Sequence, residues 1–523
     1  MFRNEPFTDF TILANRARFQ EVLAALDARI VTMSLVAGPI INGVELSSEE
    51  KFERVDPSNP DELVGTTSFA QLNHVEQALD SLERGFHSWS RRAAEERCQI
   101  IRAVGARMRK DRVHLAALII RESGKNWREA DADVAEAIDF CDYYAEQFLP
   151  LSRPFRTEEL VGEDNVYLYK PRGIFAVIAP WNFPLAILCG MSVAALVCGN
   201  VVALKPAEQT CQIAAEFMRI LLECGIPGDA CAFLPGRGEV VGDALVRSPR
   251  VHGVVFTGSK TVGLSIIEHS SKVHDGQYFI KKVIAELGGK NAIIVDEDAD
   301  LDEAIKGVTQ SAFGFSGQKC SACSRVLVVG DAYEPFMERF IDATSSLIIG
   351  VPSDPATAIG PVIDSESAER INKIIEEGAK NARLRYRANV PQKGFFASPA
   401  IFSDIEIDHP IWRDEIFGPV VACRKTSSLL EALSLANNSP YALTGGIFSR
   451  SPESISLARE QFEVGNLYIN RTCTGALVGR QPFGGFKLSG VGSKAGGKDY
   501  LLQFLEPRTI TENTLRRGFA PST

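Results

Sequence analysis

From residue 173 onward, short apolar runs alternate with segments of helix length. The runs in the first stretch lie at 173–179, 201–204, 230–234, 251–256 and 282–287. This alternation is typical of repeated βαβ units, because two neighbouring parallel strands need a crossover between them. Right-handed crossovers wind such units into an α/β sheet that binds nucleotides at the carboxyl ends of its strands. The sequence therefore predicts an α/β fold with a Rossmann-type cofactor domain.

A second set of apolar runs follows residue 291, and it predicts a second α/β region. These runs lie at 292–295, 325–329, 420–424, 445–448 and 467–470. Residues 1–170 differ, because their apolar residues recur at helical spacing in 75–89, 94–108 and 130–148. We therefore expect this first part to be mainly helical.

Charge and cysteine content narrow the possible classes of protein. The net charge is −10 over 523 residues, whereas a general nucleic-acid binder needs a basic surface. The 11 cysteines, an odd number without regular spacing, favour a reducing compartment such as the cytoplasm. Cys320 and Cys323 form a CxxC pair with no second pair nearby, so no metal site is predicted.

The sequence predicts no membrane segment. The first 30 residues carry charges of both signs, unlike a secretory signal. Residues 185–204 are uncharged and long enough to span a bilayer, but Gly190, Gly199 and Asn200 interrupt them. We expect a buried helix after Pro184, a Gly-Asn turn and a strand instead.

Two segments are candidates for cofactor contacts. Phe256-Thr257-Gly258-Ser259 precedes a predicted helix, and the free amides at a helix N-terminus suit a pyrophosphate. Lys205-Pro206-Ala207-Glu208 ends the second predicted strand. An acid there accepts hydrogen bonds from ribose hydroxyls and repels a 2′-phosphate, so Glu208 favours NAD over NADP and Lys205 weakens that preference. The alternative is the capped start of a surface helix.

Cys320 is the candidate nucleophile, because Gly317, Lys319 and Ser321 are unusual neighbours for a core cysteine. A thiol reacts as its thiolate, and a helix N-terminus or a nearby cation lowers its pKa. We expect a helix to begin at residues 321–323 and Lys319 to supply such a cation. For Cys323 we expect packing, with a redox pair to Cys320 as the alternative.

Glu136 and two isolated strands are further features of the sequence. Glu136 lies off the apolar stripe of its predicted helix, which is usual for a solvated glutamate. Segments 165–170 and 500–511 are predicted strands outside both sheets, and they suggest an arm used in assembly.

Seven motifs occur in a characteristic order and spacing. They are Pro180-Trp181-Asn182-Phe183-Pro184, Lys205-Pro206-Ala207-Glu208, Phe256-Thr257-Gly258-Ser259, Glu286-Leu287-Gly288-Gly289-Lys290-Asn291, Gly317-Gln318-Lys319-Cys320, Glu415-Ile416-Phe417-Gly418-Pro419 and Pro482-Phe483-Gly484-Gly485-Phe486-Lys487. Together they resemble the NAD(P)-dependent aldehyde dehydrogenase superfamily over almost the whole chain.

The resemblance implies catalytic roles for three residues. Cys320 matches the nucleophile, Glu286 the general base, and Asn182 the side-chain amide that holds the oxyanion. It also implies an NAD site. The matching positions are Ala179, Pro180, Trp181, Lys205, Glu208, Gly238, Phe256, Thr257, Gly258, Ser259, Leu287, Gly288, Glu415 and Phe417.

Residues 133–140, 162–165 and 470–483 more narrowly resemble the L-glutamate γ-semialdehyde dehydrogenases within that superfamily. The resemblance implies oxidation of this semialdehyde, formed from Δ1-pyrroline-5-carboxylate, to L-glutamate in proline catabolism. The substrate positions implied are Ser321, Gly475 and Ala476 for the α-carboxylate, Phe183 and Phe483 for the aliphatic chain, and Glu136 for the amino group. For Glu136 this interpretation stands beside the solvated one.

The same resemblance implies how the domains are arranged. The NAD-binding domain is expected at 1–155 and 173–289, with 472–492 returning near it, and the catalytic domain at 290–471. The oligomerisation arm is expected at 156–172 and 493–523. A homodimer or an assembly of dimers is implied, with a proline dehydrogenase as a possible contact.

Three rival functions stay open. One is oxidation of a longer or uncharged aldehyde, and another is a CoA-acylating reaction, which retention of Glu286 disfavours. The third is a binding protein that kept the fold without the activity.

Overall fold

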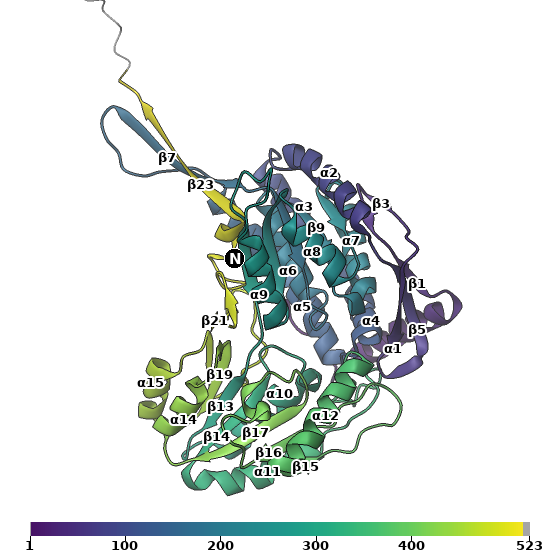
Figure 1. Cartoon of the computed structure of the whole chain (residues 1–523), viewed down its shortest axis with the longest axis vertical. Helices are drawn as coiled ribbons and strands as arrows, with labels where there is room; N and C mark the ends of the chain where they lie inside the picture. The colour runs from purple at the N-terminus through teal and green to yellow at the C-terminus, as the bar shows by residue number, and fades with distance from the viewer. Residues whose placement is uncertain (1, 516–523) are drawn as a thin grey trace, which may run out of the picture.

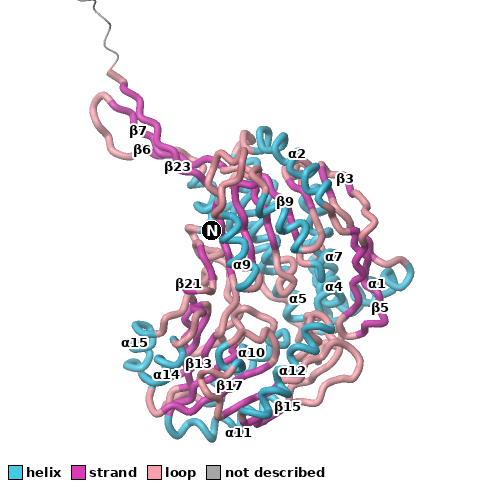
Figure 2. Tube along the Cα trace, in the orientation of Figure 1, coloured by secondary structure: helices cyan, strands magenta, loops and turns pink. Residues whose placement is uncertain are grey.

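The computed structural model describes residues 2–515, which form two lobes and a projecting arm (Figure 1). One lobe contains an eight-stranded sheet and the other a seven-stranded sheet. Figure 2 shows helices around both sheets and many loops where the lobes meet. Among residues 2–515, no helix is both long and apolar enough to cross a membrane.

The eight-stranded sheet has the order β22-β12-β11-β8-β9-β10-β2-β3. Its strands are β2 (Ile40–Ile41), β3 (Val44–Glu45), β8 (Ile174–Ile178), β9 (Val201–Lys205), β10 (Cys231–Phe233), β11 (Val251–Thr257), β12 (Lys282–Glu286) and β22 (Gly490–Val491). The five predicted runs are β8 to β12, so the predicted parallel sheet is confirmed. β8 pairs in parallel with both β9 and β11. The strand order therefore reverses beside β8, where open α/β sheets bind their ligands.

The helices of this lobe follow the predicted pattern in most places. They are α1 (Leu13–Thr32), α2 (Leu72–Trp89), α3 (Ala94–Lys110), α4 (Arg112–Ser123), α5 (Trp127–Leu151), α6 (Ala186–Val197), α7 (Cys211–Glu223), α8 (Asp243–Arg247) and α9 (Lys260–Ser270). The uncharged stretch 185–204 is the buried helix α6, a turn and β9, as predicted. Asn200 fixes that turn, because its Oδ1 accepts hydrogen bonds from the backbone N–H groups of Arg172 and Gly173.

The prediction that residues 1–170 are mainly helical is wrong for residues 35–68. That segment forms β2 and β3 and the whole of a separate three-stranded sheet, in the order β1 (Leu35–Ala37), β5 (Asn59–Ser68) and β4 (Lys51–Asp56). Asn42 and Gly43 connect β2 and β3 with φ values of 52° and 74°. Two positive φ angles define the type I′ hairpin turn that an Asn-Gly pair favours, so the sequence carried this signal.

The seven-stranded sheet has the order β15-β16-β17-β14-β13-β19-β20. Its strands are β13 (Asn291–Val295), β14 (Cys323–Val329), β15 (Arg383–Arg387), β16 (Ala400–Ser403), β17 (Val420–Thr426), β19 (Thr444–Phe448) and β20 (Asn466–Ile469). The helices of this lobe are α10 (Leu301–Phe313), α11 (Tyr333–Ser345), α12 (Ser365–Asn381), α13 (Pro410–Arg413), α14 (Leu429–Asn437) and α15 (Pro452–Gln461). The five predicted runs are confirmed, and β15 and β16 extend the sheet beyond them. Outside both large sheets, the short strands β18 (Tyr441–Ala442) and β21 (Phe486–Lys487) pair with each other.

The two isolated strands predicted outside the sheets pair with each other. β7 (Glu163–Pro171) runs antiparallel to β23 (Leu505–Asn513), and β6 (Phe155–Arg156) pairs with the other edge of β7. The three strands project from the body (Figure 1). Residues 500–504, expected as strand, form a 3₁₀ turn packed into the core instead. Of the expected arm, residues 516–523 lie outside the described residues.

Candidate active site

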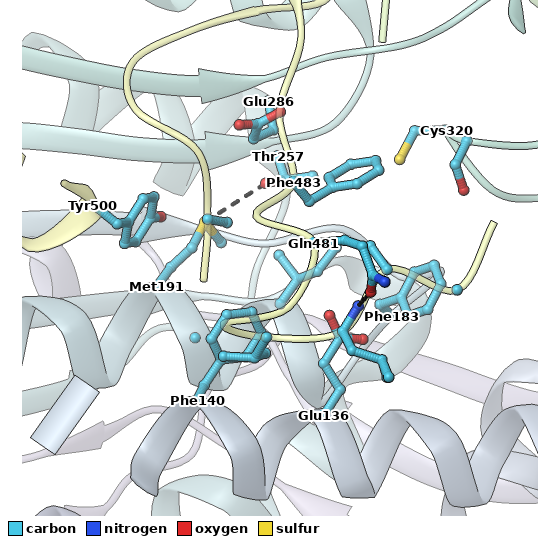
Figure 3. Close-up of a pocket in the computed structure, with 18 of the residues that line it drawn as sticks. Glu136, Phe140, Phe183, Met191, Thr257, Glu286, Cys320, Gln481, Phe483 and Tyr500 are labelled. Carbon is cyan, nitrogen blue, oxygen red and sulfur yellow. Dashed lines mark hydrogen bonds between the residues drawn. The ribbon is translucent and has the colours of Figure 1, made fainter. Parts of the chain in front are cut away.

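A cavity of about 120 Å³ lies between the two lobes and contains most of the predicted reactive residues. A buried water needs about 10–15 Å³ on this measure, so the cavity suits a small organic molecule. Its wall from the first lobe comes from α5 and from the segment 183–191, which includes the start of α6. The opposite wall comes from the loop 475–483 after β20. Figure 3 shows Cys320 and Glu286 toward one side of this space and Glu136 and Phe140 toward the other.

Cys320 lies in a rigid turn between α10 and β14. Asn291 Nδ2 donates hydrogen bonds to the carbonyl oxygens of Cys320 at 2.7 Å and Ala322 at 2.9 Å. The expected helix at 321–323 is absent, because Cys323 already pairs with Asn291 as the first residue of β14. Gly317 precedes the turn with φ 69°, and a Cβ there would lie 2.3 Å from the carbonyl oxygen of Gly418. The nucleophile is thus held by strand pairing and close backbone packing.

The expected lowering of the thiol pKa is also contradicted. Burial, together with the nearby carboxyls of Glu415 and Glu286, raises the pKa of Cys320. Lys319 does not offset this, because its ammonium forms an ion pair of 2.7 Å with Glu129. The Cys320 thiol is therefore protonated in this state, and a base must take its proton before it can attack. Cys323 is buried in the core, so its predicted packing role is confirmed.

Glu286 ends β12 and lines the same cavity as Cys320. Burial raises its pKa to about 8, and the nearby ammonium of Lys494 opposes that shift. Within the described part of the chain, its Oε2 atom is buried and has no hydrogen-bond partner. A carboxyl with a pKa near neutrality and an oxygen without a hydrogen-bond partner is suited to accept a proton from a thiol or from water.

Asn182 lies beside the nucleophile turn and is 4% exposed. Its Nδ2 donates a hydrogen bond of 3.1 Å to the carbonyl oxygen of Gln318, two residues before Cys320. An amide nitrogen carries two N–H donors, so one donor remains for a ligand. The structure therefore brings Asn182 close to the cysteine, as the sequence motif predicts.

The predicted cofactor residues gather at the carboxyl ends of β8, β9, β11 and β12. Lys205 Nζ donates to Glu208 Oε1 at 2.9 Å, and the same oxygen accepts from the N–H of Gly238 at 2.7 Å. Ser259 caps α9, with its side chain accepting from the N–H of Val262. These groups place a carboxylate and a helix N-terminus at the same edge of the sheet, after β9 and β11, and this set of donors and acceptors fits a dinucleotide.

Not every predicted cofactor residue has a side chain that is free to contact a cofactor. Phe256 and Leu287 belong to the hydrophobic core of the lobe. Of the others, Ala179 continues from β8, and its N–H donates to the carbonyl of Lys205. Pro180 lies between Ala179 and Trp181, and Thr257 Oγ1 contacts the sulfur of Met191 at 3.7 Å. Gly258 follows β11 directly.

Glu415 and Phe417 of the second lobe contact residues that follow β12 and β8 of the first lobe. Glu415 Oε1 accepts a hydrogen bond from the N–H of Gly289 at 2.9 Å. Gly288 permits this contact, since a Cβ there would lie 2.1 Å from a Glu415 oxygen. The ring of Phe417 packs edge-on against Trp181, with centroids 5.4 Å apart. Segments far apart in the sequence thus meet near the turn that carries Cys320.

All six predicted substrate residues line the cavity. They are Glu136, Phe183, Ser321, Gly475, Ala476 and Phe483. Gly475 has φ 72°, and a Cβ at this residue would meet no atom within 4 Å, so its backbone borders open space. The solvated alternative for Glu136 is wrong, because this residue faces the cavity and burial raises its pKa to about 8.

Several residues of the site were not predicted. Tyr144, Gln481 and Tyr500 also line the cavity. Lys125 lies behind it, with Nζ 3.9 Å from the centre of the Phe183 ring. Lys125 belongs to the break between α4 and α5, and nothing in its local sequence indicates a contact with a residue 58 positions later.

Comparison with known proteins identifies the family of the chain. Residues 44–510 match the aldehyde dehydrogenase family, and the chain belongs to that family. A 1-pyrroline-5-carboxylate dehydrogenase from Geobacillus sp. (strain WCH70) is 45% identical to it, covering 98% of this chain and 99% of the relative.

Two solved structures are similar over nearly the whole chain. A 1-pyrroline-5-carboxylate dehydrogenase from Thermus with bound NAD has a TM-score of 0.96 and 42% identity, covering 98% of this chain and 99% of that one. Proline utilization A from Bdellovibrio bacteriovorus has a TM-score of 0.97 and 48% identity, covering 100% of this chain. This chain spans about half of that larger protein, or 54%.

Proposed function

We propose that this protein oxidises L-glutamate γ-semialdehyde to L-glutamate, with NAD as the electron acceptor, in proline catabolism. The semialdehyde is the open form of Δ1-pyrroline-5-carboxylate. One observation carries the proposal: the candidate nucleophile, the candidate base and all six candidate substrate residues line one cavity. Relatives named for this substrate support it over the full length of the chain.

In the proposed reaction, water in the cavity carries the proton of Cys320 to solvent, and the thiolate attacks the aldehyde carbon. The second N–H of Asn182 and the backbone N–H of Cys320 hold the oxygen that becomes negative. After the hydride has left, the acyl group remains on Cys320 as a thioester. Glu286 then takes a proton from a water that attacks the thioester, and glutamate is released.

Bound NAD supplies the acceptor for the hydride. We assign its ribose and phosphate contacts to Glu208, Lys205 and Ser259, and its nicotinamide end to Glu415 and Phe417. The hydrogen bond of Glu208 to the N–H of Gly238 keeps a carboxylate where a 2′-phosphate would be repelled. This arrangement favours NAD over NADP.

The substrate's carboxylate is assigned to Ser321 and to the backbone amides of Gly475 and Ala476. Successive amides next to a glycine with positive φ form a concave site that suits an anion. Phe183 and Phe483 enclose the aliphatic chain, and Glu136 faces the amino group.

We further propose that the chain assembles as a homodimer, or as an assembly of dimers, through the arm of β6, β7 and β23, and that it acts in the cytoplasm. The arm presents most of its residues to solvent in the single chain. The similarity to a proline utilization A structure supports a functional link to proline dehydrogenase. Light scattering tests the assembly, and a monomer would contradict it.

The proposed function is tested by NADH formation from Δ1-pyrroline-5-carboxylate, with propanal and succinic semialdehyde as comparison substrates. We expect kcat/KM to be highest for the first. Preference for propanal would favour the rival with an uncharged aldehyde. A strict requirement for CoA would favour the acylating rival, and NAD binding without any turnover would favour the binding protein.

A further inference from the structure

Five ionisable side chains lie behind and beside the substrate cavity, and their charges nearly balance. Two of them are lysines, Lys125 and Lys319, and three are acids, Glu129, Asp133 and Glu136. Lys125 Nζ lies 2.7 Å from Asp133, and both side chains are fully buried. Lys319 Nζ lies 2.7 Å from Glu129, with side chains 9% and 21% exposed. Each lysine is therefore already paired with one acid.

Of the three acids, Glu136 is the one that forms no ion pair with either lysine. Among residues 2–515, no donor forms a hydrogen bond or ion pair with its carboxyl, although it lines the cavity. Asp139, the next acid on α5, is satisfied differently, because it accepts from Asn4 Nδ2 and from the N–H of Glu5. An ionised Glu136 would therefore be an uncompensated charge next to an apolar cavity, which is costly.

The contacts of the buried ion pair explain why Lys125 is not diverted to Glu136. Asp133 also accepts a hydrogen bond from the N–H of Ala186 at the start of α6, so it fixes both Lys125 and the cavity wall. The Lys125 ammonium lies over the ring of Phe183, which lines the cavity. Moving Lys125 toward Glu136 would break its buried ion pair with Asp133. It would also remove the ammonium from the face of the Phe183 ring.

The proposed substrate carries the missing charge. L-Glutamate γ-semialdehyde has an α-ammonium group in addition to its carboxylate, and the cavity offers one acid without a partner. We propose that Glu136 is neutral in the free enzyme and releases its proton to solvent when the substrate's ammonium group binds. This inference rests on the proposed function and adds a proton-linked step to substrate recognition.

The surrounding charges agree with this state. Burial raises the pKa of Glu136 to about 8, with Asp133 and Asp139 adding to the shift and Lys125 and Lys319 opposing it. The hydroxyl of Tyr144 also lies near Glu136, and burial raises its pKa well above the usual range, so it stays neutral. At neutral pH the cavity is therefore free of net charge until a cationic ligand enters. On binding, the O–H bond of Glu136 breaks, and the buffer takes the proton.

Calorimetry with the reaction product tests the proposal. L-Glutamate is titrated into the full-length enzyme at pH 7 in phosphate and in Tris, two buffers with different heats of protonation. We expect the two binding enthalpies to differ by the amount that corresponds to about one released proton per site. Glutarate has both carboxylates and lacks the amino group, so its binding enthalpy should not depend on the buffer.

Two variants on the same helix separate the role of Glu136 from a general effect of charge. Glu136→Gln keeps the side-chain shape; it should abolish the proton release and weaken glutamate binding about tenfold or more, with glutarate little changed. Asp142→Asn removes a charge on α5 that pairs with Arg109 outside the cavity, and it should leave proton release intact. If calorimetry gives too little heat, the pH dependence of product inhibition by glutamate and glutarate gives the same comparison.

The outcomes distinguish this inference from the proposed function. Turnover of Δ1-pyrroline-5-carboxylate is measured on the same preparation. Turnover together with a buffer-independent enthalpy for glutamate would overturn the proton release alone. Equal proton release with glutarate would also overturn it, since no ammonium is then required. Absence of turnover and of glutamate binding would overturn the proposed function itself.

Discussion

The two ends of the cavity differ in how their groups are held and in what they decide. At the reactive end, Cys320 is fixed by Asn291 and by the pairing of β14, and Glu286 ends β12, which pairs with β11. At the anchoring end, Gly475 and Ala476 lie in a loop with an open backbone. Strands hold the candidate reacting groups, whereas the groups assigned to recognise the substrate lie on a loop, on α5 and, for Ser321, beside the nucleophile. Changes at the first end should affect every aldehyde, and changes at the second should affect one substrate more than another.

The largest effect on turnover is expected from a change of the nucleophile. Cys320→Ala removes the sulfur that forms the covalent intermediate, so turnover should fall by about 10⁴-fold or more for all aldehydes. NAD binding, measured by calorimetry, should stay within about twofold of the parent, since the assigned ribose contacts lie in the other lobe. Substantial oxidation of any aldehyde by this variant would contradict the assignment of Cys320 as the nucleophile.

The next effect concerns the base. Glu286→Gln should slow hydrolysis of the acyl enzyme by about 10²–10⁴-fold, and stopped-flow measurements should still show one rapid burst of NADH. In the parent enzyme, Glu286 acts as a base only when ionised, and its pKa is raised to about 8. Steady-state turnover limited by hydrolysis should therefore rise with pH through this value and fall toward pH 6. Loss of the burst together with turnover would show that Glu286 is needed before the thioester forms.

A smaller and selective effect is expected at the anchoring end. Ser321→Ala removes a hydroxyl assigned to the carboxylate, and such a charge-assisted hydrogen bond is worth about 1.5–3 kcal/mol. KM for Δ1-pyrroline-5-carboxylate should rise about 10–100-fold by steady-state kinetics. Propanal, which has no carboxylate, serves as the control and should change little. An equal loss for both substrates would mean that the two ends are not separable.

The smallest effect is expected at Lys494, the cation that opposes the raised pKa of Glu286. Its Nζ donates to the carbonyl of Gly465 and, at 3.0 Å, to Asn466 Oδ1. Lys494→Met should raise the pKa of Glu286 further and move the rising part of the pH profile of turnover by up to about one unit to alkaline pH. Lys494→Arg keeps the charge and should restore the parent profile. If the pH profile of turnover did not shift in Lys494→Met, Lys494 would not influence the pKa of Glu286.

Much of the fold and the reactive end could be predicted from the sequence, for physical reasons. Buried parallel strands are continuous apolar runs, so β8 to β12 were recognisable without a structure. The strands between residues 35 and 68 were missed because they are short or mostly half-exposed, although the Asn42-Gly43 turn indicated a hairpin.

The site residues also divide into those that the sequence predicts and those that it does not. Cys320, Glu286 and Asn182 lie within motifs, and the structure brings them together. The pKa of Cys320 was wrongly expected to be low, since the sequence does not show that Lys319 is paired with Glu129. The contact of Lys125 with Phe183 depends on how α5 and α6 pack, which no local pattern records.

The most direct test is to trap the acyl enzyme. Glu286→Gln is mixed with NAD and Δ1-pyrroline-5-carboxylate, quenched in acid, and digested for mass spectrometry of the peptide that contains Cys320. We predict a glutamyl group on Cys320, present only when NAD is added. An unmodified Cys320 peptide after the NADH burst, or the adduct on another residue, would contradict the assignment of the nucleophile.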